Sequence, residues 1–232
     1  MANYKLLRLS ATLVLIGGVL VTVIVEFLHP GGGTTVEATF ANFAGSGDWA
    51  AIHLGQFIGN AVLLAGLLVL FFALDVSHGA PRWLGFFGAL AAGVAIALAG
   101  VVFAVDGVAN KQAVDAWVSA PAAEQTARFA SAEALRWLEW GTTSYQDFMM
   151  GLALVLFAVV TVWTARVPRL LGALMGVSGM AFLVLGWVIG TTGFTPATTV
   201  PTDTGFLLLF ASMIWLFIAT WRRKELVQAA PA

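Results

Sequence analysis

Two histidines and a glutamate stand at the facing ends of two very hydrophobic segments. Glu26 and His29 close the first segment, and His53 lies near the start of the second. Residues three or four apart share one face of a helix, and Glu-x-x-His is the spacing that helical carboxylate metal sites use. Zinc accepts two imidazoles with one or two carboxylates and keeps a position open for water. The pattern therefore predicts a site for a divalent transition metal, with the candidate ligands Glu26, His29, His53 and Glu139.

Further polar residues follow these at helical spacing, so that each helix would carry a stripe of polar side chains along one face. Gln56 and Asn60 follow His53 at helical spacing, and a similar stripe follows Glu139. Polar groups within a membrane are costly when they face lipid, so they are expected to face the interior and to bond to one another. We therefore predict a polar pocket open to the outside, which Asp106 and Lys111 could join. Its predicted ligand-binding residues are Gln56, Asn60, Thr143, Tyr145, Gln146 and Asp147.

Other interpretations of the same residues stay open. His29 and His53 could be the two axial ligands of a haem, although their spacing does not specify one. Each histidine could instead be an interfacial side chain, and the stripes could simply join helices. The leading hypothesis is binding of a small ligand or metal ion without an assigned reaction. The alternatives are a metal-dependent membrane hydrolase or oxidoreductase, a small-molecule or proton-coupled transporter, and a structural membrane subunit.

The composition indicates the class of protein that must position these residues. The chain has 232 residues, of which 60% are hydrophobic and 10% are charged, whereas a soluble domain has about 25% charged residues. The absence of cysteine excludes disulfides and thiolate metal ligands. We predict an all-α membrane helix bundle that forms one domain over residues 1–232. Membrane lipids are the expected partners and nucleic acid is not, while the sequence does not determine the oligomeric state.

Six hydrophobic segments approach or exceed the ~20 residues that cross a bilayer. The predicted transmembrane helices are residues 9–27, 50–74, 83–105, 143–164, 170–191 and 205–221. The connecting segments 30–48 and 106–141 are expected to form an outer cap with short surface helices. Thr34 and Glu37 fit a capping box at the start of one of them, and Asp48 is the expected N-cap of the second span.

The basic residues indicate the orientation. If both termini lie inside, eight of the eleven Lys and Arg residues lie on that side, which is the bias of membrane proteins toward positive inner loops. We therefore expect both termini in the cytoplasm and a bacterial inner membrane as the location. The eight residues are Lys5, Arg8, Arg82, Arg166, Arg169, Arg222, Arg223 and Lys224.

Two short motifs resemble those of a known family. Residues 166–172 contain Arg-x-Pro-Arg-x-Leu-Gly, and residues 53–57 read His-Leu-Gly-Gln-Phe. Together they resemble a large, functionally uncharacterised family of small bacterial six-span membrane proteins. The resemblance implies the six-span architecture and brings no activity with it.

Overall fold

The computed structural model describes residues 3–33 and 35–228, apart from the side chains of Glu26 and of residues 222–228. Every regular element in these residues is a helix, and no strand occurs among them. Six helical stretches are long and apolar enough to cross a membrane. The protein is therefore an integral membrane protein with an all-α bundle, as the sequence predicts.

The helices fall into two groups by length and position. The long helices are α1 (Tyr4–Phe27), α3 (Trp49–Leu74), α4 (Gly79–Ala104), α6 (Gln125–Thr164), α7 (Arg169–Thr192) and α8 (Thr199–Gln228). The short ones are α2 (Val36–Gly45), the π-helix η1 (Val105–Asn110), α5 (Lys111–Val118) and the 3₁₀ helix η2 (Pro196–Thr198). Helix α4 continues through η1 into α5 without a break, so the third span and part of the cap form one rod.

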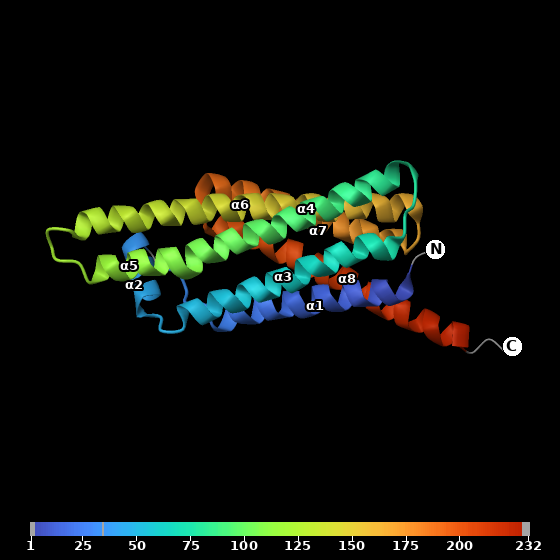
Figure 1. Cartoon of the computed structure of the whole chain (residues 1–232), viewed down its shortest axis with the longest axis horizontal. Coiled ribbons are helices and arrows are strands. Elements are labelled where there is room, and N and C mark those ends of the chain that lie inside the picture. The colour runs from blue at the N-terminus through green and yellow to red at the C-terminus, as the bar shows by residue number, and fades with distance from the viewer. Residues whose placement is uncertain (1–2, 34, 229–232) are drawn as a thin grey trace.

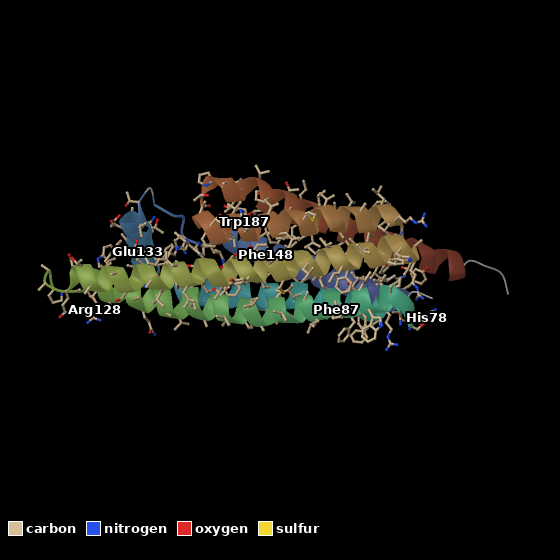
Figure 2. All side chains as sticks on the ribbon, turned by 90° about the horizontal axis from the view of Figure 1, so that it is seen from above. His78, Phe87, Arg128, Glu133, Phe148 and Trp187 are labelled. Atoms are coloured by element: carbon tan, nitrogen blue, oxygen red, sulfur yellow. The ribbon has the colours of Figure 1, made fainter. Side chains whose placement is uncertain are left out.

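The long helices run along the long axis of the molecule, and α1 begins at the same end at which α8 finishes (Figure 1). We call this the terminal end. The opposite end, where α2, α5 and the first turns of α6 lie, is the cap end. His78, in the loop between α3 and α4, is at the terminal end, while Arg128 and Glu133 lie toward the cap end (Figure 2).

Helix α6 shows how the cap is built. The sequence predicts short surface helices within residues 106–141, but from Gln125 onward these residues form the first part of α6, which continues the fourth span. Helix α6 has 40 residues, which is about 60 Å of helix, roughly twice the hydrocarbon thickness of a bilayer. Its first turns therefore stand clear of the span, and α5 packs against them. A small buried cluster joins the cap helices to the bundle: Phe40, Phe43, Trp49, Val114 and Ala132.

Both predicted helix starts are found, but each cap differs from the prediction. Helix α2 is capped by Thr35, whose hydroxyl accepts a hydrogen bond from the Ala38 amide at 3.2 Å. The cap is therefore one residue later than Thr34, which lies outside the described residues. Asp48 occupies the N-cap position of α3, but its side chain makes no capping hydrogen bond.

Helices α6 and α7 approach each other at two glycines. A Cβ atom added to Gly151 would lie 2.6 Å from the carbonyl oxygen of Gly179, and one added to Gly179 would lie 2.7 Å from that of Gly151. Small residues that allow such close backbone approach are typical of packed membrane helices. The seam fixes α6, and with it the polar residues that α6 carries.

Replacing Gly151 by alanine is expected to lower the free energy of unfolding by about 1–3 kcal/mol, because the new methyl group meets rigid backbone. Gly93→Ala in α4 is the matched control, since a Cβ there meets nothing within 4 Å. That control should be neutral, or more stable by up to about 1 kcal/mol through helix propensity. Thermal unfolding in detergent measures both, and equal losses would contradict the close contact.

Candidate metal site at the cap end

Three potential metal ligands from three elements converge at the cap end. His29, His53 and Asp106 each offer one ligand atom, and these atoms lie within 4.8 Å of one another. His29 follows the end of α1, His53 lies in the first turns of α3, and Asp106 belongs to η1. The side chains of His53 and Asp106 are buried and that of His29 is half-buried, so the group is largely shielded from solvent.

The end of α1 directs His29 toward α3. The amides of Leu28 and His29 both donate to the carbonyl of Ile24, at 3.1 and 2.9 Å. Pro30 then ends the helix, because proline has no amide hydrogen and its ring clashes with the preceding turn. The imidazole of His29 comes to lie 5.2 Å from that of His53 and 5.3 Å from the ring of Trp49, measured between ring centroids.

The π-helical turn η1 aims Asp106 inward. Such turns are rare and are often found at functional sites, because the extra residue changes which side chains face the interior. In η1, Asp106, Gly107 and Asn110 are all buried. A Cβ atom at Gly107 would lie 2.6 Å from the Cβ of His53. The missing side chain at this position therefore lets η1 lie directly against the histidine.

Backbone carbonyls orient both imidazoles in the same way. The Nδ1 atom of His53 lies 2.8 Å from the carbonyl oxygen of Trp49, and that of His29 lies 2.9 Å from the carbonyl oxygen of Pro30. Because a carbonyl can only accept, Nδ1 is the donor in each ring, and a neutral ring keeps an unprotonated Nε2. Histidines that bind metals usually have this second interaction, which fixes the tautomer and the ring orientation.

The His53–Asp106 contact fits a proton at its present length and a metal ion after a small shift. Nε2 of His53 and Oδ2 of Asp106 are 2.8 Å apart. A neutral imidazole and an ionised carboxylate would present two acceptors to each other, so a proton or a metal ion must satisfy both. One proton does so at hydrogen-bond distance. A tetrahedral zinc ion, with bonds near 2.0 Å, requires a separation of about 3.3 Å between the two atoms. The donor set therefore fits a metal ion after a shift of about half an ångström.

Burial affects the charge of His29. Desolvation lowers the pKa of His29 below its ordinary value of 6.5, and the neighbouring His53 lowers it further, while the carboxylate of Asp106 opposes the shift. A lowered pKa means that His29 is neutral at neutral pH. Its Nε2 is then available as a ligand.

Glu139, which the sequence suggests as a ligand, is engaged elsewhere. The Nη1 atom of Arg136 lies 2.7 Å from Oε1 of Glu139, and the pair is nearly buried, with side chains 16% and 4% exposed. The amide of Asn110 lies 3.2 Å from Asp106 and 3.5 Å from Glu139, measured to a carboxylate oxygen in each case. Glu139 therefore borders the histidine group through Asn110 and is neutralised by Arg136.

Sequence reasoning missed the surroundings of Arg136. Its guanidinium carbon lies 5.3, 6.0 and 5.1 Å from the ring centroids of Phe43, Trp140 and Phe194. These rings come from α2, α6 and the segment that follows α7. Arg136 and Glu139 are three residues apart, which was a usable signal for the ion pair. The three aromatic rings around Arg136 gave no such signal in the sequence, because they are distant from one another along the chain.

The deeper polar residues are only partly brought together. The side-chain amide of Gln146 donates to Oδ1 of Asn60 at 3.4 Å, and Asn60 donates to the carbonyl of Gln56. This contact joins α3 to α6 inside the bundle. Tyr145 is 64% exposed, because it is rotated by about 100° around α6 from its neighbour Gln146. The predicted pocket therefore does not include its side chain.

Two further residues that the sequence predicts at the site are Glu26 and Lys111. The side chain of Glu26 lies outside the described residues, so its role as a ligand stays a prediction. Lys111 does not join the pocket. Its Nζ atom bonds the carboxylate of Asp115 at 2.6 Å and the carbonyl of Ala44 at 3.2 Å. Lys111 therefore fastens α5 to α2.

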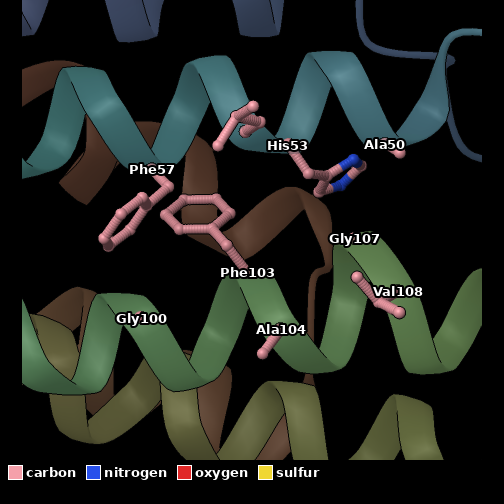
Figure 3. Close-up of a pocket in the computed structure, with 9 residues that line it drawn as sticks. Ala50, His53, Phe57, Gly100, Phe103, Ala104, Gly107 and Val108 are labelled. Carbon is pink, nitrogen blue, oxygen red and sulfur yellow. The ribbon is translucent and has the colours of Figure 1, made fainter.

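A hollow of about 200 Å³ lies beside His53, between α3 and the α4–η1 rod (Figure 3). Phe57 and Phe103 form one end, and the imidazole of His53 lies at the other with its nitrogen atoms turned away from them. Leu54 and Val108 line the hollow and are 59% and 51% exposed. The hollow is therefore an apolar recess on the outside of the bundle, which reaches the carbon edge of His53.

Fold and site together define the class: an integral membrane protein with six long apolar helices and a largely buried cluster of two histidines and one aspartate at one end. Comparison of the chain with protein-family models, with curated proteins and with solved structures finds no match. Its function must therefore be inferred from its own residues.

Proposed function

We propose that this protein binds one divalent transition-metal ion at its cap end through His29, His53 and Asp106. The observation that supports this is the convergence of three ligand atoms within 4.8 Å, with Nδ1 of both histidines held by backbone carbonyls. Two imidazoles and one carboxylate form the ligand set of many zinc and non-haem iron sites. Such sites keep one or more positions open for water or another ligand.

The charge balance of the site also favours a cation. Among the described residues, Glu139 is compensated by Arg136 and Asp115 by Lys111. The buried carboxylate of Asp106 contacts His53 at 2.8 Å, where either a proton or a metal ion can compensate its charge. A buried charge is stable only when it is paired or coordinates a metal. A divalent ion would provide that compensation.

The packing of the terminal half supports binding rather than transport. Leu63 and Leu67 of α3 and Leu154 and Phe157 of α6 are each 0–1% exposed and belong to one continuous core. Ions cross membranes along polar or water-filled routes. In the described part of the bundle, this core is mostly apolar, and the buried polar residues near it carry single hydroxyl groups: Ser10, Thr161, Ser178, Ser212 and Thr220. We therefore propose that the site holds its ion without passing it on.

Elemental analysis of protein purified without chelator tests this function. We expect one zinc, iron, copper or nickel ion per chain, because imidazole ligands suit these metals. Chelator should remove the ion, and re-addition should restore it together with a higher melting temperature, since a ligand that binds only the folded state stabilises it. If the protein holds no stoichiometric metal and none of these ions raises the melting temperature, His53 and Asp106 form a structural pair instead.

The lowered pKa of His29 predicts a specific titration. Protonation of His29 should appear only as the pH falls below 6.5, its ordinary value. Above its lowered pKa the ring is neutral and able to bind metal, since ligands must be deprotonated. Histidine NMR of chelator-treated protein in detergent, with His29→Gln to assign the signal, measures the midpoint. A midpoint at or above 6.5 would mean that the ring is not desolvated as described.

We further propose that the cap end faces the outside of a bacterial inner membrane. Arg8, Arg82, Arg166 and Arg169 all lie at the terminal end, where positive residues favour the cytoplasm. The chain contains no cysteine, so single cysteines can be labelled without background. In sealed cells, an impermeant thiol reagent should label Asp115→Cys and leave Ser77→Cys unlabelled. The opposite pattern would reverse the orientation.

A further inference from the structure

A second carboxyl group lies deeper in the bundle than the metal site. Asp147 is on α6, eight residues beyond Glu139 toward the terminal end, and is 6% exposed. Helix α6 ends at Thr164, 17 positions beyond Asp147, which is about 26 Å of helix. Since the hydrocarbon layer is about 30 Å thick, Asp147 lies within the membrane.

Asp147 makes no hydrogen bond or ion pair with any residue that the structure describes. Its carboxyl belongs to none of the ion pairs among the described residues, although the helices around it carry several charged groups. The titratable or charged residues on the elements that contact α6 are His53 on α3, Arg82 on α4, Asp106 on η1, Lys111 and Asp115 on α5, and Arg169 on α7. On α6 itself they are Arg128, Glu133, Arg136, Glu139 and Tyr145, and Glu124 is its N-cap.

The neighbouring polar residues have a structural role, since they form hydrogen bonds to other helices. Gln146 bonds Asn60 across to α3, and Ser144 donates to a carbonyl of α7 at 2.7 Å. Asp147 joins no helices in this way. The hydroxyl of Thr143, one turn earlier, is also buried without a partner among the described residues. Hydrogen bonding between helices therefore explains the burial of Gln146 and Ser144. It does not explain the burial of Asp147 and Thr143.

The spacing along α6 connects Asp147 to the cap end. Glu139, Thr143 and Asp147 are separated by four residues each, which places them on one face of the helix. The hydroxyl of Thr143 can both donate and accept a hydrogen bond. It lies between the deep carboxyl and the polar residues of the cap end, so it is positioned to relay a proton.

We propose that Asp147 is a reversible proton-binding site inside the membrane, with Thr143 as the relay toward the cap end. Binding adds one proton to a carboxylate oxygen, and release returns it by way of the hydroxyl. Ionisable residues within membrane helices typically mark proton and ion pathways. A metal cation would need several oxygen ligands, whereas one carboxyl and one free hydroxyl suffice for a proton. The proposal does not depend on the metal site.

Infrared difference spectroscopy of the whole protein at increasing pH tests this proposal. We expect a carbonyl band of a protonated carboxylic acid that is present at neutral pH, declines as the pH is raised, and is missing in Asp147→Asn. A band that is the same in Asp147→Asn, or that never changes with pH, would overturn the proposal. Loss of the band on adding sodium at constant pH would also overturn it, because the occupant would then be a metal cation.

The relay is tested by the rate at which this band shifts in deuterium oxide. Thr143→Ala should slow the shift at least tenfold, whereas Thr142→Ala should not, because the neighbouring Thr142 hydroxyl already bonds the carbonyl of Leu138 at 3.0 Å. Equal rates in the two variants would overturn the relay.

A further measurement needs no variant. Dicyclohexylcarbodiimide reacts with protonated carboxyls in apolar surroundings, so peptide mass spectrometry of wild type should find its adduct on Asp147 at neutral pH and less of it at higher pH. Absence of that adduct would contradict a proton on Asp147.

Discussion

Replacing His53 by alanine is expected to reduce metal occupancy from one ion per chain to background while the bundle stays folded. The substitution removes a ligand and leaves Asp106 without its partner at 2.8 Å. The main core is a separate, apolar cluster, and a hydrogen bond between membrane helices contributes only about 0.6–2 kcal/mol. Elemental analysis, with circular dichroism to verify the helix content, measures the two effects separately.

His78→Ala is the control for this variant. His78 is the remaining histidine of the chain and lies at the terminal end, where its Nδ1 contacts the hydroxyl of Ser77. Its replacement should leave the metal content unchanged. Unchanged metal content in His53→Ala would contradict the proposed site, and loss of metal in His78→Ala alone would assign the ion to the other end of the molecule.

Replacing Arg136 by methionine is expected to lower the free energy of unfolding by about 3–5 kcal/mol, the usual loss when one member of a buried ion pair is removed. Glu139, whose side chain is 4% exposed, would be left as a buried charge without its partner. The contacts with three aromatic rings would be lost as well. Chemical or thermal unfolding in detergent measures the change.

The same helix offers a matched control. Arg128 and Glu124 form a similar pair at 3.2 Å, but their side chains are 53% and 55% exposed. Arg128→Met should therefore change the stability by less than about 1 kcal/mol. Adding Glu139→Gln to Arg136→Met should recover much of the loss, since the uncompensated charge disappears. Similar losses for Arg128→Met and Arg136→Met would contradict the burial of the inner pair.

The six spans could be predicted because bilayer thickness imposes a length that hydrophobicity alone reveals. The predicted segment 50–74 differs from α3 by one residue, and 170–191 differs from α7 by one residue at each end. Larger differences occur where a helix continues into water. Helix α6 begins at Gln125 rather than at residue 143, because its first turns are stabilised by packing against α5 rather than by lipid.

Residue type and helical spacing predicted part of the site, and tertiary contacts determine the rest. His29 and His53 were identified because ionisable groups are rare beside long apolar segments. Asp106 was foreseen only as a residue that could join them, because its direction depends on the π turn and on the contact of Gly107 with α3. The prediction of Glu139 as a ligand rests on its residue type alone, although its three-residue spacing from Arg136 indicates an ion pair.

Anomalous diffraction from crystals of the metal-loaded protein tests the proposed site most directly. Data collected above and below the absorption edge of the bound metal should show one strong peak enclosed by His29, His53 and Asp106. The peak should lie about 2.0–2.2 Å from one ligand atom of each residue. A metal-loaded crystal that has no peak at this position, or whose only peak lies elsewhere in the molecule, would contradict the assignment.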